Sequence, residues 1–180
     1  MNLGSLKKLI IEDYYSRYKK DFSIVNFTKA YLLDLNFRVV TRYRIQTYLS
    51  TKNKLCFILA VLLRNGNMSK YGVEIGINTK IKGGFNIHHI NGIVIGEEVC
   101  IGENFNIFQQ VTIGKKDIKY PIIGDNVKIY PGVKVIGDIK VGNNVIIGTN
   151  SVVNKDIATG AVVAGIPAKV IEHKRSVIYE

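Results

Sequence analysis

Cysteine is scarce in this sequence, and the N-terminus has no long apolar segment. The 180 residues include two cysteines, Cys56 and Cys100, which lie 44 positions apart and form no C-x-x-C motif. This spacing favours neither a zinc knuckle nor a disulfide framework, so a reducing cytoplasm is the expected location. The first residues also lack the sustained hydrophobic region of a secretory signal peptide.

Long hydrophobic runs are absent as well. The longest one, residues 55–63, has nine residues, whereas a helix needs about 20 to cross a bilayer. Apolar residues nevertheless make up 47% of the chain, which is enough for a hydrophobic core. Length and composition therefore predict a folded, soluble protein of one domain, or of one domain with a small extension.

Acidic residues are few in the N-terminal part. Residues 1–70 contain 13 Lys and Arg against 4 Asp and Glu, whereas residues 71–180 contain 12 against 10. One interpretation of this excess of positive charge is attraction to a membrane surface or to phosphate groups. A solvated helical face without a charged partner is the alternative. No helix-turn-helix, winged or base-stacking pattern accompanies the charge, so nucleic acid is not an expected partner.

A six-residue repeat is the most abundant pattern that the sequence does contain. An aliphatic residue recurs at this spacing, with two interruptions, at Ile75, Ile81, Ile87, Ile93, then Ile95, Ile101, Ile107, Ile113, then Ile123, Ile129, Val135, Val141, Ile147 and Val153. Such a repeat is typical of a β-helix, in which each short strand forms one side of a coil. Glycine often follows the repeated residue, as at Gly102 and Gly124. We expect it there because a corner requires permissive backbone angles.

The two interruptions of the repeat are informative. The first follows His88 and His89 directly, and the second inserts four residues between Ile113 and Ile123, around the segment 115–119. A continuous prism of stacked coils requires neither interruption. We therefore expect both of them to serve something other than packing.

Composition changes at the turn-rich residues 65–72. Before this point apolar residues recur at three- and four-residue spacing, as at Phe27, Tyr31 and Leu35, which predicts amphipathic helices. We expect a mainly β protein with an N-terminal α-helical region (1–70), a β-helix domain (71–172) and a C-terminal tail (173–180). The open ends and apolar faces of such a prism are commonly buried in a symmetric oligomer.

The repeat region resembles a known family. Three of its segments carry the resemblance: "YGVEIGINTKIKGGFNIHHINGIVIGEEVCIGENFNIFQQVTIG", "YPIIGDNVKIYPGVKVIGDIKVGNNVIIGTNSVVNKDI" and "AVVAGIPAKVI". They resemble the hexapeptide acyltransferases. The similarity is greatest to the serine acetyltransferase family, in its polysaccharide-biosynthesis-type branch. The most specific match is H-x-x-G-I-V-I-G-E, from His89 to Glu97. The resemblance implies a left-handed parallel β-helix, acetyl-CoA as co-substrate without a metal, and a homotrimer. Whether trimers pair stays open.

His89 is the candidate catalytic base. Transfer of an acetyl group from a thioester to a hydroxyl requires a base for the hydroxyl proton, and imidazole titrates near the working pH. In the resembling family an aspartate fifteen positions earlier orients the histidine, and Glu74 stands at that position here. The resemblance thus implies a His89–Glu74 pair. The alternatives are a solvated corner histidine and an exposed charge on the first coil.

Three residues match acceptor-binding positions of the resembling family. His88 replaces an aspartate that shapes the acceptor pocket, and Lys119 replaces an arginine that grips the substrate carboxylate. Lysine can neutralise a carboxylate but cannot reproduce the bidentate geometry of arginine. Asp21 matches the family aspartate that receives the serine amino group. Adjacent histidines point to different sides of an extended chain, so His88 and His89 are not expected to share a metal.

Donor-binding residues are implied by the same resemblance. Small residues suit a close approach of backbone to ligand. In the family, such positions line the pantetheine groove between two subunits or contact the CoA phosphates. The corresponding residues here are Gly114, Pro131, Gly132, Thr149, Pro167 and Lys169. Ordinary corner residues are the alternative for each.

Together these observations predict an acetyl-CoA-dependent O-acetyltransferase. The missing arginine, the histidine at position 88 and the basic N-terminal half favour a sugar hydroxyl in surface polysaccharide biosynthesis as the acceptor. L-Serine is the alternative acceptor, supported by Glu74, Asp21 and the overall match to the family. A non-catalytic trimeric scaffold is a third hypothesis, against which His89 argues.

Overall fold

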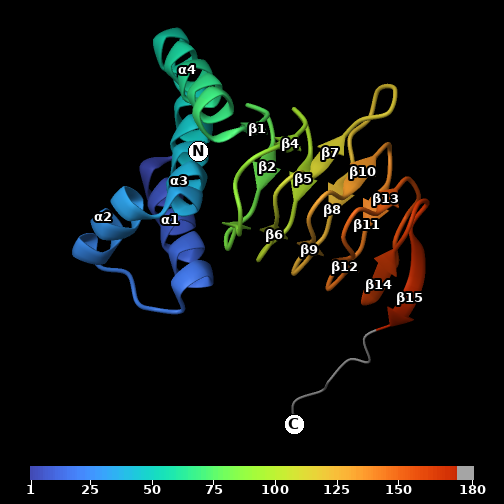
Figure 1. The fold of residues 1–180 in the computed structure, drawn as a ribbon. Helices are drawn as coiled ribbons and strands as arrows, with labels where there is room; N and C mark the ends of the chain where they lie inside the picture. Colours follow the sequence, from blue (N-terminus) through green and yellow to red (C-terminus); the bar gives the residue numbers. More distant parts are fainter. Residues whose placement is uncertain (174–180) are drawn as a thin grey trace.

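A computed structural model describes residues 1–173 and places four helices at one end of a stack of parallel coils (Figure 1). The predicted tail, 173–180, lies outside the described residues except for its first position. The helices are α1 (Leu3–Tyr18), α2 (Ile24–Leu33), α3 (Leu35–Ser50) and α4 (Lys54–Tyr71). Within the described range, no helix combines the length and the apolarity needed to span a membrane.

Each helix begins at a polar residue whose side chain accepts a hydrogen bond from a backbone N–H of the first turn. These capping residues are Asn2, Ser23, Asp34 and Asn53. Such caps satisfy N–H groups that have no partner inside the helix. The apolar spacing of Phe27, Tyr31 and Leu35 turns out to cross a boundary between two helices. The boundary lies at Asp34, whose backbone is extended (φ −108°, ψ 105°).

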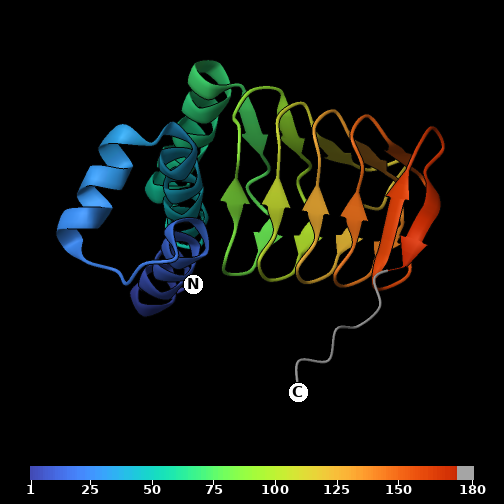
Figure 2. The same cartoon turned by 60° about the horizontal axis from the view of Figure 1, so that its bottom comes forward.

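The coils form a three-sided prism in which each side is a sheet of parallel strands, except for one antiparallel strand at the end of face C (Figure 2). Face A contains β1 (Val73–Ile75), β4 (Ile93–Ile95), β7 (Thr112–Gly114), β10 (Lys134–Ile136) and β13 (Val152–Val153). Face B contains β2 (Lys80–Ile81), β5 (Cys100–Ile101), β8 (Ile122–Ile123) and β11 (Lys140–Val141). Face C contains β3 (Asn86–Ile87), β6 (Asn106–Ile107), β9 (Lys128–Ile129), β12 (Ile146–Ile147), β14 (Ala161–Ala164) and the antiparallel β15 (Lys169–His173).

The predicted repeat is confirmed by the strand register. On face A the repeated residues pair in sequence, as Ile75, Ile95, Ile113, Val135 and Val153. All five side chains are at most 3% exposed, so the column forms part of the hydrophobic core. The structure therefore confirms a largely β solenoid with an N-terminal helical region.

Both interruptions of the repeat are corners that contain extra residues. Paired residues on face A are 18 positions apart between Ile95 and Ile113, but 20 apart between Ile75 and Ile95 and 22 apart between Ile113 and Val135. The first insertion lies between β3 and β4, where the two histidines are found. The second forms the loop of residues 115–119 between β7 and β8.

Glycines that follow the repeated residues serve packing rather than backbone freedom. Gly102 and Gly124 do not have positive φ, and asparagines such as Asn104, Asn126 and Asn144 adopt that conformation instead. A Cβ atom at Gly102 would lie 2.6 Å from the carbonyl carbon of Gly124 in the next coil. The expectation of permissive angles at these glycines was wrong, because close contact between coils excludes a side chain there.

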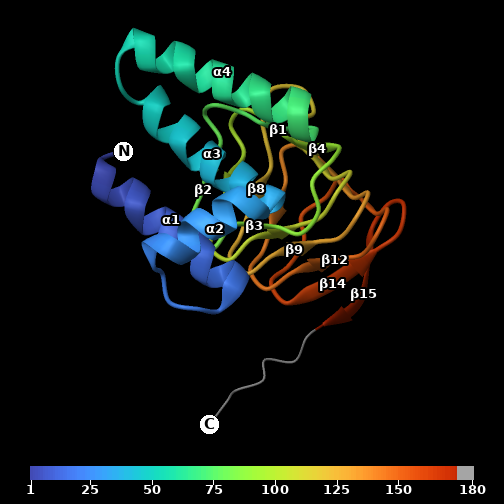
Figure 3. The same cartoon turned by 60° about the vertical axis from the view of Figure 1, so that its left-hand side comes forward.

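α3 covers the open edge of the first coil (Figure 3). No coil precedes this one, so carbonyl groups along its edge would lack donors, a problem common to all exposed sheet edges. Side chains of α3 supply those donors. The pairs are Tyr43 to the carbonyl of Thr79 (2.9 Å), Gln46 to that of Ile75 (3.1 Å), and Arg44 to those of Ile81 and Lys82.

Arg44 also forms an ion pair of 2.7 Å with Asp13 of α1, and both side chains are at most 2% exposed. The substitution Arg44→Met leaves the Asp13 carboxylate buried without its partner. We expect the free energy of unfolding to fall by about 3–5 kcal/mol, measured by urea denaturation. The double variant D13L/R44M should lose less than the single one. A single-variant loss below about 1 kcal/mol, the range of surface pairs, would contradict the role of the pair.

Candidate functional site

The first insertion forms a corner between faces C and A, and we call its residues 88–92 the histidine corner. The backbone N–H of His88 donates to the carbonyl of Ile107 in the next coil at 2.9 Å. His89 makes no backbone hydrogen bond of this kind within the described residues. Its side chain is exposed, whereas that of His88 is half-buried.

Two hollows flank the histidine corner. One has a volume of ≈ 940 Å³, lies between α1 and face C, and is lined by both His88 and Asp21. The structure thus brings two of the predicted acceptor-binding residues together. The other hollow has a volume of ≈ 550 Å³ and is lined by His89 and by the junction of α2 and α3, including Asp34 and Asn36. The two imidazoles therefore line different hollows.

His88 belongs to a stack of rings with one ring per coil. Its ring lies 4.3 Å from that of Phe108 at an angle of 5°, and Phe108 lies 5.1 Å from Tyr130. The His88 Nε2 atom is 2.9 Å from Oδ1 of Asn106. Burial lowers the pKa of His88, and the positive charge of Arg17 lowers it further. The hydrogen bond with Asn106 raises the pKa, but by less than these two effects lower it. His88 is consequently an uncharged hydrogen-bonding group at neutral pH. Among residues 1–173, no three His, Cys, Asp or Glu side chains form a group that could hold a metal.

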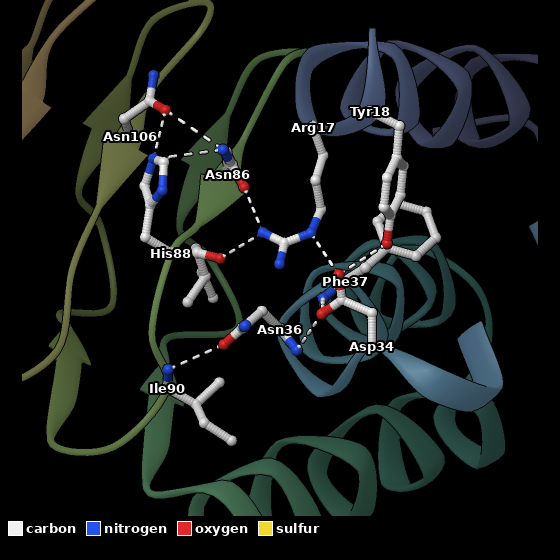
Figure 4. A network of polar contacts seen from close by, with 10 residues as sticks. Arg17, Tyr18, Asp34, Asn36, Phe37, Asn86, His88, Ile90 and Asn106 are labelled. Carbon is white, nitrogen blue, oxygen red and sulfur yellow. Dashed lines mark hydrogen bonds and ion pairs between the residues drawn. The ribbon is translucent and has the colours of Figure 1, made fainter. Parts of the chain in front are cut away.

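A polar network that the sequence analysis missed joins the helices to the histidine corner (Figure 4). Asp34 accepts hydrogen bonds from Nε of Arg17 (2.5 Å) and from the hydroxyl of Tyr18 (2.7 Å). Nη1 of Arg17 donates onward to Oδ1 of Asn86 and to the carbonyl of Ile87, each at 2.8 Å. Burial raises the pKa of Asp34, but the hydrogen bonds from Tyr18 and Arg17 outweigh it and hold the pKa below its ordinary value. The only signal in the sequence was an aspartate placed to cap a helix.

Glu74 lies on the outer surface of β1, opposite Val94 of the next coil. None of the ion pairs formed among residues 1–173 joins it to His89. The predicted His89–Glu74 pair is therefore not formed within this chain, and it stays a prediction.

Lys119 lies on a different edge of the prism from His89. Its loop connects face A to face B, whereas the histidine corner connects face C to face A. The Lys119 ammonium is 2.8 Å from Oδ2 of Asp138, and this hydrogen bond raises the lysine pKa. A single chain thus does not bring Lys119 and His89 together, and the lysine charge is already matched by a carboxylate.

The predicted donor-binding residues are divided between these two edges. On the edge of the histidine corner, between strands of faces C and A in later coils, lie Pro131, Gly132 and Thr149. Pro167 is in the turn that follows β14, and Lys169 begins β15. The turn is tied to face A, because the N–H of Ala168 donates to the carbonyl of Val152 at 2.8 Å. Gly114 ends β7 and lies beside the 115–119 loop.

Comparisons with known proteins agree with this architecture. The family model "Bacterial transferase hexapeptide (six repeats)" matches residues 120–155. Serine acetyltransferase of Bacillus pumilus is 34% identical over 170 residues, which cover 91% of this chain and 76% of that protein. The serine acetyltransferase of Buchnera aphidicola from Acyrthosiphon pisum is 30% identical over 184 residues, covering 99% of this chain and 66% of the relative.

Two solved structures extend the likeness to three dimensions. A serine acetyltransferase in complex with CoA has a TM-score of 0.81 at 33% identity, covering 94% of this chain and 71% of that chain. The Neisseria gonorrhoeae serine acetyltransferase in complex with serine also has a TM-score of 0.81, at 29% identity, covering 92% of this chain and 69% of that one.

The chain belongs to the serine acetyltransferase family. This confirms the predicted family, while none of these relatives is described as a polysaccharide-biosynthesis enzyme. The chain spans 66% of the length of the Buchnera relative. In this member of the serine acetyltransferase family, the histidine corner and its two hollows lie where the helices meet the first coil.

The lowered pKa of His88 predicts a pH dependence of stability. An unfolded histidine has a pKa of about 6.5, so the unfolded state binds the proton more readily than the folded state. The His88 contribution to stability is complete above about pH 6.5 and is lost as pH falls from there through the lower folded-state pKa. His88→Phe keeps an aromatic ring over Phe108 but does not titrate. Its urea midpoint should therefore fall less between pH 7.5 and 5 than that of the parent, and parallel curves would contradict this assignment.

Proposed function

We propose that this chain is an acetyl-CoA-dependent O-acetyltransferase whose acceptor is L-serine. The observation that carries the proposal is the exposed imidazole of His89, at a solvent-accessible corner on the same prism edge as Pro131, Gly132 and Thr149. The relatives of this chain support L-serine as acceptor, since they are named serine acetyltransferases. They also support acetyl-CoA as donor, since one structure of a relative is a complex with CoA.

In this mechanism His89 removes the proton from the acceptor hydroxyl as its oxygen attacks the thioester carbonyl. The carbon–sulfur bond then breaks, and the protonated His89 returns the proton to the departing thiolate, so that the products are the acetyl ester and the free thiol. Backbone N–H groups at the corner would stabilise the oxyanion of the tetrahedral intermediate. No proton or electron is required from elsewhere.

The proposal includes a homotrimer. Lys119 and Gly114 lie on one edge of the prism and His89 on another, so a neighbouring copy is needed to bring the two sets together. Closed cyclic symmetry gives each subunit the same contact between one edge and the other.

A sugar hydroxyl is the second candidate acceptor. Two observations favour it. Lys119 stands where the family has an arginine, and a lysine cannot hold the carboxylate of an amino acid in bidentate geometry. The hollow that contains Asp21 and His88 also carries the amide side chains of Asn104 and Asn106, and amides are suited to hydrogen bonding with hydroxyl groups.

Thiol release from acetyl-CoA separates the two acceptors. The assay uses L-serine as sole acceptor in one series, and nucleotide sugars or oligosaccharides in the other. Turnover with L-serine supports the primary proposal. Turnover with glycan acceptors alone would replace it by the sugar candidate, and the absence of turnover with every acceptor would favour a scaffold.

Removal of the imidazole tests the mechanism with whichever acceptor is used. His89→Ala should lower kcat by about 10²- to 10⁴-fold, the usual contribution of a general base. The oligomer should persist in size-exclusion chromatography, because the exposed His89 side chain contributes little to packing. A variant that retains nearly full turnover would exclude His89 as the base.

A further inference from the structure

We infer that Arg17, Asp34 and Asn36 form a clamp that positions the His89 turn for acetyl transfer. The inference rests on the proposed role of His89. It assigns these three residues to positioning, since none of them is the base itself. It is drawn from the contacts that surround the histidine corner on both sides (Figure 4).

The clamp grips the chain just before and just after His89. Before it, the carbonyl of Ile87 accepts a hydrogen bond from Nη1 of Arg17 at 2.8 Å. After it, the N–H of Ile90 donates to Oδ1 of Asn36 at 3.0 Å. His89 is therefore bracketed by two contacts to the helices, although its own side chain remains exposed.

Asp34 connects the two arms of the clamp. Its Oδ2 atom accepts from Arg17 at 2.5 Å, and its Oδ1 atom accepts from the backbone N–H groups of Asn36 at 3.0 Å and Phe37 at 3.2 Å. The hydroxyl of Tyr18 donates to Oδ2 as well. Because both oxygens are occupied by donors, Asp34 is poorly placed to accept a further hydrogen bond from the His89 ring, although both line one hollow.

The next coil holds the histidine corner on both sides of His89 but not at His89 itself. The N–H of His88 donates to the carbonyl of Ile107, and the carbonyl of Asn91 accepts from the N–H of Gln110, each at 2.9 Å. This corner contains the two extra residues of the first coil, and His89 has no backbone hydrogen bond to a neighbouring coil within the range described. The corner also includes two successive positive-φ residues, Asn91 (φ 97°) and Gly92 (φ 70°). A displacement of about 1 Å in a catalytic group can cost about 10²-fold in rate, so these contacts bear directly on turnover.

The first test is the isosteric substitution Asp34→Asn. Asparagine caps a helix as well as aspartate does, so the start of α3 is kept while the charge that holds Arg17 is removed. We expect kcat to fall by about 10- to 100-fold. The KM for acetyl-CoA should stay within about twofold, because ground-state binding of the donor is not altered.

The second test uses a pair of substitutions at Asn36. Asn36→Ala removes the acceptor for the N–H of Ile90 and should lower kcat by a similar factor. Asn36→Asp retains a side-chain oxygen at this position and should restore kcat to within about threefold of the parent, since a carboxylate oxygen accepts the same hydrogen bond. A purely structural role would not give this rescue together with an unchanged KM.

Asp13→Asn is the matched control. Asp13 also links a helix to the first coil, through Arg44. Arg44, however, contacts the carbonyls of Ile81, which ends β2 on face B, and of Lys82, which follows it. This variant should lower the unfolding midpoint and leave kcat of the folded protein within about twofold, because additive effects are expected at distant sites.

Hydrogen exchange of the Ile90 amide gives a readout that does not depend on activity. Asn36→Ala should accelerate this exchange, and Asn36→Asp should not. If kcat of Asp34→Asn and Asn36→Ala stays within twofold of an active parent, the clamp is not a positioning device. If the parent is inactive with every acceptor, the proposed function fails, and unchanged exchange in Asn36→Ala would then also overturn the clamp.

Discussion

The open edge of the first coil is the constraint on which the rest of this structure depends. A β-solenoid satisfies its backbone through neighbouring coils, and the first coil has a neighbour on one side only. Side chains of α3 supply the missing donors, with Arg44 held in place by Asp13 of α1. The same docking places the end of α1 and the junction of α2 and α3 beside the histidine corner. The helices that satisfy the open sheet edge therefore also line the candidate site.

Chemistry and packing are separated along the prism. The regular coils, 18 residues long on face A between Ile95 and Ile113, bury a column of aliphatic side chains. The irregular coils carry His88, His89 and Lys119 at their corners, because extra residues there can leave the ladder of hydrogen bonds without disturbing the core. Within one chain these corners lie on different edges, one with His89 and the other with Lys119, which is why the proposed mechanism includes a second copy.

Sequence reasoning recovered part of the candidate site. It predicted that His88 and His89 would face different sides, and the two side chains line different hollows. It also assigned both Asp21 and His88 to acceptor binding, and the structure places them in the lining of one hollow. It missed Arg17, Asp34 and Asn36, because a residue's position in a helix does not indicate which distant residue it will contact. It also assigned the corner glycines to backbone freedom, whereas contact between coils explains Gly102 and Gly124.

The solenoid, the two irregular corners and the change from helix to strand near residue 72 could all be predicted from the amino-acid sequence. They follow from local periodicity, because an aliphatic residue that is buried in the core recurs at every sixth position of the chain. The identity of the residues that surround His89 depends instead on how distant segments pack together. The contacts of Arg17 with Ile87 and of Asn36 with Ile90 span 70 and 54 positions. They arise from the way the helices fold back over an unpaired sheet edge, and no short pattern of residues encodes that geometry.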